Sequence, residues 1–175
     1  MTLRKNLLVA LLAAVLCVLS PWAIPVGGIP VTLATLGVYL AAGLLGIKGG
    51  TAAVGLYLAV GAIGAPVFSG FTGGIHPLEG LTGGFLWGFL PCALLCGWLS
   101  ARTGRFALPL GFAAGTAVLY LCGAAWYCLQ TRTDVGAAVL ACVLPFLPAD
   151  IVKIGAASLL TASLRRHLPL REHHT

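Results

Sequence analysis

The sequence has very few charged side chains: Asp, Glu, Lys and Arg together make up only 8% of its 175 residues. Soluble domains carry about 25% charged residues, so this composition excludes a soluble enzyme or a soluble binding domain. Hydrophobic residues account for 59% of the chain, and its mean hydropathy is +1.03. The sequence therefore predicts an all-α integral membrane protein that crosses the cell membrane several times.

Acidic residues are the scarcest charged type, with four Asp and Glu against ten Lys and Arg. The net charge of +6 does not indicate nucleic-acid binding, because the basic residues lie mostly at the ends of apolar runs. The motif GxxxxGK[ST] is absent, which excludes a P-loop ATPase, and GxSxG and HExxH are absent as well. Asp150 is the only acidic residue well inside an apolar run, so we expect no enzymatic activity.

Metal-binding patterns are missing too, because the sequence has no CxxC pair and no Cys/His cluster with zinc-ligand spacing. The six cysteines all lie in apolar stretches: Cys17, Cys92, Cys96, Cys122, Cys128 and Cys142. A free thiol in such a place packs as a small hydrophobic group. The sequence therefore predicts packing cysteines, no metal and no cofactor.

A transmembrane helix needs about 20 apolar residues, so this chain has room for about six spans and little else. The basic start followed by an apolar run is similar to a signal peptide. We expect it to be retained as the first span, because its apolar character continues past Pro21. The prediction is one domain, 1–175, with six transmembrane helices. Breaks at Pro/Gly clusters place these near residues 4–22, 33–46, 50–64, 82–101, 106–129 and 148–166.

The basic residues are consistent with an even number of spans. With six spans, one side of the membrane carries Arg4, Lys5, Lys48, Arg102, Arg105, Arg165, Arg166 and Arg171. The opposite side carries only Arg132. Because positive residues mark the cytoplasmic side, we expect both termini to be cytoplasmic.

Two external segments are unlike simple loops. Segment 21–33 contains three prolines, and segment 64–84 is long, glycine-rich and apolar. Irregular backbone at membrane depth needs protein or a cavity to satisfy its polar groups, so we expect these segments to cap a cavity on the outer side. The stretch 135–146 is too short to span and predicts a short helix with Asp134 at its N-cap.

Asp150 and Lys153 are opposite charges three residues apart inside an apolar run, so on a helix they share one face. Charges inside a span are costly and mark functional sites. The functional interpretation is that the pair binds a small polar solute. The structural interpretation is that the two charges neutralise each other and hold the helix in place.

Several other residues near the outer side are candidates for the same site. Gly73, Gly74, Gly83 and Gly84 can expose backbone N–H groups to a ligand carboxylate, or serve only turns and close packing. Thr82 lies at the start of the fourth helix, while Phe68 and Phe85 flank the glycine-rich segment as possible pocket walls. Ala10 and Ala14 form a small-xxx-small pair that permits close approach of a partner helix.

Two stretches carry a resemblance to a known family. Residues 29–89, which include PVFSGFTGG and GLTGGF, and residues 145–153, PFLPADIVK, resemble the biotin-specific S component of energy-coupling factor transporters, the BioY family. The second stretch is similar to that family's PFxPGDxxK element. The chain departs from the family pattern at three places, with Ala34 in place of glutamine, Leu81 in place of proline and Ala149 in place of glycine.

The resemblance implies a six-helix S-component fold that captures biotin from outside the cell. It also implies two kinds of partner, a transmembrane coupling protein that contacts Ala10 and Ala14, and two cytoplasmic ATPases. Our hypothesis is that Asp150 accepts hydrogen bonds from the ureido N–H groups of biotin. Lys153 then donates to the ureido oxygen or pairs with the ligand carboxylate.

Three alternatives remain open at this point. The same fold can serve another vitamin, which a panel of competing ligands would distinguish. A membrane enzyme would turn over a substrate and lose that activity on Asp150→Ala. A structural subunit without a ligand would tolerate apolar residues in place of both Asp150 and Lys153.

Overall fold

The computed structural model describes residues 3–26, 29–102, 104 and 106–167. The described elements, in chain order, are α1 (Leu3–Leu19), β1 (Ala23–Val26), β2 (Ile29–Thr32), α2 (Ala34–Ala62), α3 (His76–Glu79), α4 (Gly83–Ser100), α5 (Ala107–Thr131), α6 (Val135–Cys142) and α7 (Leu147–His167). The short helix expected in 135–146 is α6, although no side-chain hydrogen bond from Asp134 caps it.

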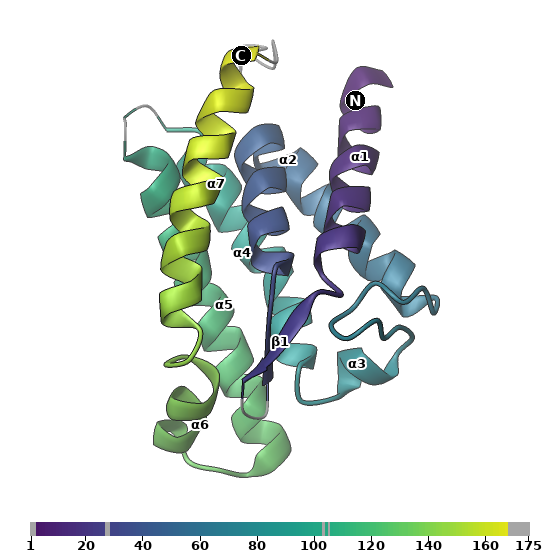
Figure 1. Cartoon of the computed structure of the whole chain (residues 1–175), viewed down its shortest axis with the longest axis vertical. Helices are drawn as coiled ribbons and strands as arrows, with labels where there is room; N and C mark the ends of the chain where they lie inside the picture. The colour runs from purple at the N-terminus through teal and green to yellow at the C-terminus, as the bar shows by residue number, and fades with distance from the viewer. Residues whose placement is uncertain (1–2, 27–28, 103, 105, 168–175) are drawn as a thin grey trace.

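The long helices lie side by side, and the small elements gather at one end of the bundle (Figure 1). The first and last described residues are at the opposite end. Segment 21–33 is more regular than we expected, because β1 and β2 form an antiparallel hairpin in which Ala23 pairs with Thr32. The hairpin satisfies backbone groups of this proline-rich segment within itself.

Helix α2 consists of two helical segments separated at Gly46, whose φ of 69° and ψ of −164° are not helical. A positive φ is accessible to glycine at little cost because it has no Cβ. The break lets the segments approach closely, since a Cβ added at Gly50 would lie 2.6 Å from the Cα of Ala42. The sequence predicted these segments as two spans, near 33–46 and 50–64.

The prediction of six transmembrane helices is wrong. Among the described residues, four helices are long and apolar enough to cross a membrane, namely α2 taken as one element, α4, α5 and α7. Helix α1 has 17 residues, which at a rise of about 1.5 Å per residue is shorter than a hydrocarbon core of about 30 Å. The prediction that both termini are cytoplasmic depended on six spans, so it loses its support. Arg105 and Arg171 lie outside the described residues.

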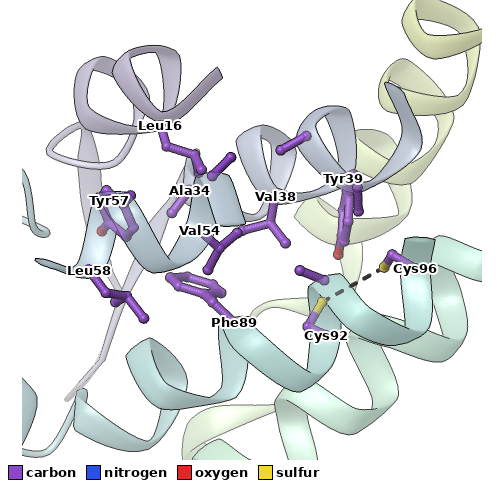
Figure 2. Close-up of a cluster of buried hydrophobic side chains, with 14 of the residues drawn as sticks. Leu16, Ala34, Val38, Tyr39, Val54, Tyr57, Leu58, Phe89, Cys92 and Cys96 are labelled. Atoms are coloured by element: carbon purple, nitrogen blue, oxygen red, sulfur yellow. Dashed lines mark hydrogen bonds between the residues drawn. The ribbon is translucent and has the colours of Figure 1, made fainter. Parts of the chain in front are cut away.

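The core is formed where α1, α2 and α4 pack together (Figure 2). Leu16, Val38, Val54 and Phe89 are buried there together with smaller side chains. Cys92 and Cys96 are completely buried in the same cluster, with their sulfur atoms 3.9 Å apart. All six cysteines are free, as expected for thiols that pack as small hydrophobic groups.

Arg165 of α7 ties three helices together at the end of the bundle that carries the described termini. Its guanidinium donates hydrogen bonds to the carbonyl of Gly43 in α2 and to that of Ser100 at the end of α4. The last carbonyls of a helix have no partner within the helix. Arg165 therefore satisfies two carbonyls, one near the break in α2 and one at the end of α4.

A candidate ligand-binding cavity

A cavity of about 510 Å³ lies at the end of the bundle where the hairpin, α3 and α6 gather. Residues from α2, α4, α5 and α7 line it, together with the hairpin and the 64–82 loop. Small-molecule sites typically measure about 300–1,000 Å³ and carry a few polar groups in an apolar wall. The described part of the cavity therefore has the size and lining of a site for one small ligand.

Asp150 and Lys153 both line this cavity and form an ion pair, with 2.8 Å between Lys153 Nζ and Asp150 Oδ1. Their exposed fractions are only 3% and 8%. Asp150 lies in the first turn of α7, where the helix dipole favours a negative charge. The three-residue spacing thus produces the predicted pair, and the fold directs it into the cavity.

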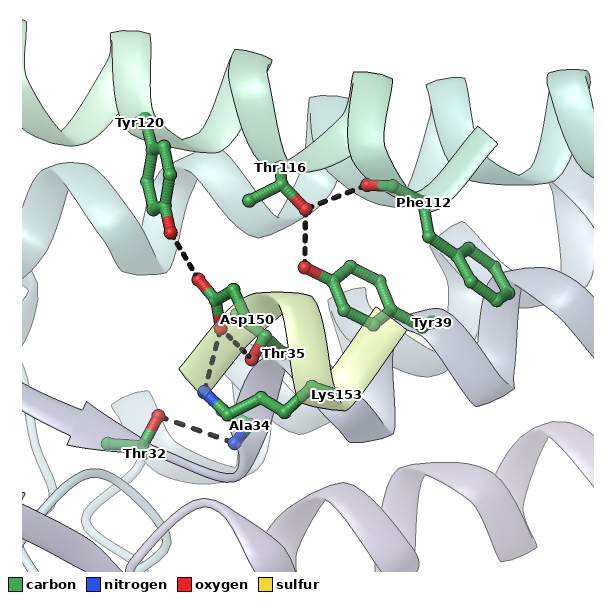
Figure 3. A network of polar contacts seen from close by, with 9 residues as sticks. All are labelled: Thr32, Ala34, Thr35, Tyr39, Phe112, Thr116, Tyr120, Asp150 and Lys153. Atoms are coloured by element: carbon green, nitrogen blue, oxygen red, sulfur yellow. Dashed lines mark hydrogen bonds and ion pairs between the residues drawn. The ribbon is translucent and has the colours of Figure 1, made fainter. Parts of the chain in front are cut away.

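Two hydroxyl groups that the sequence analysis did not single out complete the surroundings of Asp150 (Figure 3). Tyr120 of α5 donates to Asp150 Oδ2 across 2.6 Å. Thr35 of α2 donates to Oδ1 across 3.4 Å. Asp150 therefore joins α7 to both α2 and α5, and each carboxylate oxygen has a protein donor.

A second polar contact lies one turn away on the same two helices. Tyr39 of α2 and Thr116 of α5 place their hydroxyl oxygens 2.5 Å apart, and Thr116 also donates to the carbonyl of Phe112. The Tyr39 ring stacks on the Phe112 ring, with centroids 5.1 Å apart. Because Thr35 and Tyr39, like Thr116 and Tyr120, are four residues apart, each pair occupies one helix face.

Three of the other predicted site residues also line the cavity: Phe68, Thr82 and Phe85. The Phe85 ring stacks against that of Phe146, with centroids 6.0 Å apart, which gives the cavity an aromatic wall. Phe68 is buried and packs edge-on against Tyr57. Thr82 Oγ1 donates to the carbonyl of Pro77, a weak contact of 3.4 Å.

The four predicted glycines are not among the residues that line the cavity. The N–H of Gly74 donates to the carbonyl of Gly61, and that of Gly83 donates to the carbonyl of Gly80. A Cβ at Gly84 would lie 2.2 Å from Trp126 Cβ, and one at Gly73 would lie 2.2 Å from the carbonyl oxygen of Ala65. These positions serve turns and close packing, and a role in ligand binding stays a prediction.

The loop that closes one side of the cavity is attached to neighbouring elements by hydrogen bonds. Trp126 of α5 donates its indole N–H to the carbonyl of Gly80 across 3.0 Å, and Gln130 donates to the carbonyl of Glu79. Earlier in the same loop, the N–H of Gly70 donates to the carbonyl of Pro21. The cavity wall between α3 and α4 is therefore held against α5.

Ala10 and Ala14 lie on an exposed face of α1, away from the buried residues Ala13 and Leu16. Exposed leucines on the same helix include Leu7 and Leu11. The described structure therefore leaves this face uncovered within the chain. Contact with a partner at Ala10 and Ala14 remains a prediction.

Tyr120 and Thr35 were not predictable from the sequence, because neither residue type is informative alone. Both lie in apolar runs, where a tyrosine or threonine is ordinary. Their shared contact with Asp150 joins residues separated by 30 and 115 positions. The only local signal is the spacing of hydroxyl residues. Thr116 lies four positions from Tyr120, and Tyr39 lies four positions from Thr35.

The geometry suits a ligand with both hydrogen-bond donors and acceptors. Asp150 offers carboxylate oxygens, and Lys153 has two further N–H donors beyond the one directed at Asp150. Phe85 and Phe146 provide apolar surface beside these charges. Such a site can bind a small, partly apolar molecule that carries N–H and C=O groups.

Comparisons with known proteins agree with this description. The chain is 35% identical to the biotin transporter BioY of Thermotoga maritima, over 93% of this chain and 96% of that protein. It is 38% identical to the biotin transporter BioY2 of Lactococcus lactis, over 92% and 90% of the two chains. A crystal structure of the S component for biotin from an ECF-type ABC transporter superposes with a TM-score of 0.86 at 28% identity, covering 95% of each chain.

These relatives are transporters, and none of the three is described as an enzyme. Their similarity to this chain extends over more than nine-tenths of its length. Together with a match of the BioY family model to residues 1–170, this shows that the chain is a multi-pass membrane transport protein that belongs to the BioY family.

Proposed function

We propose that this protein is the substrate-binding membrane subunit for biotin uptake. The observation that carries the proposal is the buried Asp150–Lys153 pair in the wall of a cavity large enough for one small ligand. A charge pair in a membrane protein is expensive to maintain for stability alone. Similarity to named biotin transporters over more than nine-tenths of the chain supports the choice of biotin.

The chemistry of biotin matches the groups that line the cavity. Biotin has a ureido ring with two N–H donors and one carbonyl, an apolar thiolane ring, and a carboxylate at the end of an apolar tail. Asp150 accepts a ureido N–H, and Lys153 donates to the ureido oxygen or pairs with the carboxylate. Phe85 and Phe146 contact the apolar thiolane ring from the side of the cavity that they line together.

The protein works as an S component with other subunits, in line with its similarity to the S component of an ECF-type ABC transporter. The partners that we propose are a transmembrane coupling protein and two cytoplasmic ATPases, since the chain itself has no nucleotide-binding motif. The exposed face of α1 with Ala10 and Ala14 is the proposed contact with the coupling protein, because small residues let helices approach closely.

Equilibrium binding of labelled biotin to the purified protein in detergent tests the ligand. We expect saturable binding with one site per chain, abolished or strongly weakened by Asp150→Asn. A well-folded protein that binds no biotin would contradict the proposal. Uptake by cells that lack their own biotin transporter, with and without co-expressed coupling protein and ATPases, then tests the need for partners.

A second candidate ligand is another small vitamin, which one observation favours. Two of the three departures from the BioY pattern, Ala34 and Leu81, line the cavity. These substitutions alter the wall that any ligand touches. Competition of labelled biotin by a panel of unlabelled vitamins separates the two candidates, and we expect only biotin and its close analogues to compete.

A further inference from the structure

We propose that Tyr120 is a positioning residue for ligand recognition, which holds the Asp150 carboxylate so that Oδ2 keeps one free acceptor site for a ligand N–H. This inference rests on the proposed function, because it assigns a role within the same site. Tyr120 carries no charge and belongs to no sequence motif. Its role follows from its hydrogen bond to Asp150.

Asp150 has more acceptor sites than its protein donors occupy. An ionised carboxylate has about four lone-pair sites, two on each oxygen. Oδ1 already accepts from Lys153 Nζ at 2.8 Å and from Thr35 Oγ1 at 3.4 Å. Oδ2 accepts from the Tyr120 hydroxyl at 2.6 Å, and no other described residue donates to it. One site on Oδ2 is therefore left for a ligand.

Burial and hydrogen bonds together hold the Asp150 carboxylate in place. Asp150 is 3% exposed and Tyr120 is 9% exposed, so water competes little for these bonds. Hydrogen bonds to a charged acceptor are stronger than neutral ones, and more so away from water. Donors from α2, α5 and α7 converge on Asp150, so its orientation is defined before a ligand arrives (Figure 3).

The groups that Asp150 and Lys153 leave free can recognise one edge of a ligand. Asp150 Oδ2 with its single vacancy and Lys153 with its remaining N–H donors form an acceptor–donor pair in the cavity wall. Such a pair matches one N–H and the neighbouring C=O of a cyclic urea or lactam. Without the Tyr120 hydroxyl, the Asp150 carboxylate loses its donor at Oδ2 and can rotate. Oδ2 and the Lys153 donors then no longer face the N–H and C=O groups of the ligand together.

Tyr120→Phe is the appropriate variant because it removes only the hydroxyl, and Tyr39→Phe is the matched control. The Tyr39 hydroxyl is likewise buried and hydrogen-bonded, in its case to the hydroxyl of Thr116. Tyr39 is not among the residues that line the cavity. We expect Tyr120→Phe to weaken biotin binding by roughly 10- to 100-fold, the size of a hydrogen bond to a charged group. The control should change the dissociation constant by less than about threefold.

Desthiobiotin distinguishes positioning from direct packing, since it keeps the urea and lacks the thiolane ring. If Tyr120 acts through Asp150, Tyr120→Phe weakens both ligands by the same factor. A loss confined to biotin would mean that Tyr120 packs on the thiolane and would overturn the inference. Unchanged binding of both ligands by a folded Tyr120→Phe protein would overturn it as well.

Infrared spectroscopy of the ligand-free protein gives a readout that does not depend on biotin. The chain has only four acidic residues, so the carboxylate band that disappears in Asp150→Asn can be assigned. We expect Tyr120→Phe to shift this band and Tyr39→Phe to leave it in place. An unshifted band overturns the inference, whereas a shifted band in a protein that binds no biotin contradicts only the proposed function.

A second pair of variants covers the case in which Tyr120→Phe does not fold. Tyr120→Gln places a side chain with a hydrogen-bond donor at this position. The leucine of Tyr120→Leu is similar in size to glutamine but has no donor. The inference predicts tighter biotin binding by the Gln variant than by the Leu variant. Equal binding by the two would contradict it.

Discussion

The hydroxyl of Tyr120 donates a 2.6 Å hydrogen bond to Oδ2 of Asp150, although the two residues are 30 positions apart and lie on different helices. Lys153 reaches the other carboxylate oxygen from the next turn of α7. The buried charge pair is therefore anchored to a neighbouring helix. This arrangement links the stability of the bundle to the shape of the cavity.

Asp150→Asn should weaken biotin binding far more than Lys153→Arg. The Asn side chain loses the negative charge that attracts three protein donors, and its amide nitrogen cannot accept a ligand N–H. Lys153→Arg keeps the positive charge, so we expect a loss of roughly tenfold for it and at least about 100-fold for Asp150→Asn. Titration with labelled biotin measures both; comparable losses would undo the assignment of roles.

Replacing both charges, as in Asp150→Leu/Lys153→Met, should abolish biotin binding and leave a folded protein. Apolar residues of similar size in place of a buried ion pair are often neutral or stabilising, whereas removing one partner costs about 3–5 kcal/mol. Thermal unfolding should therefore rank the double variant above Asp150→Leu alone. A double variant that still binds biotin would show that the pair is only structural.

Gly84→Ala should destabilise the protein by about 1–3 kcal/mol, because a Cβ there meets Trp126 and the carbonyl of Cys122. Gly55→Ala is the control, since a Cβ at Gly55 has nothing within 4 Å. In a helix that substitution should stabilise by about 0.5–1 kcal/mol. Unfolding temperatures measured with and without biotin separate packing from binding: if Gly84 binds the ligand directly, its variant loses affinity without losing stability.

Arg165→Met should destabilise the protein by about 2–4 kcal/mol, because it leaves the carbonyls of Gly43 and Ser100 without their donor. Arg166 is the neighbouring exposed arginine, and Arg166→Met should change stability by less than about 0.5 kcal/mol. Denaturation in detergent measures the difference between the two variants. Biotin affinity should stay unchanged in both variants, since Arg165 lies at the end of the bundle opposite the cavity. Equal stability of the two variants would show that the hydrogen bonds of Arg165 contribute nothing to the free energy of unfolding.

The sequence alone was sufficient for the class of protein and for the central pair of the candidate site. Scarce charge and long apolar runs indicate membrane helices because hydropathy is a property of each segment by itself. Asp150 and Lys153 were recognisable because a spacing of three residues on a helix brings side chains together without help from the rest of the fold. The short helix after Asp134 was predictable because its apolar run is also a local feature. Of the six cysteines predicted to pack as small hydrophobic groups, Cys92, Cys96 and Cys142 are buried and the other three are half-buried.

The number of spans was not predictable in this way. Whether residues 33–64 form one element or two depends on the backbone at Gly46, and glycine adopts helical and non-helical conformations about equally well. The pairing of Ala23 with Thr32 was missed because prolines in the segment suggested irregular backbone. Hydropathy counts apolar residues, but it does not report where the chain turns.

The partners of the pair were decided only by the tertiary structure. Thr35, Tyr120 and Arg165 are ordinary residues within their own helices, and each gains its role from an acceptor on another helix. A buried donor or acceptor must be satisfied, but the sequence does not state which distant group will do so. Local patterns therefore determined the membrane helices and the charge pair, while packing between helices determined how that charge pair is held in the cavity.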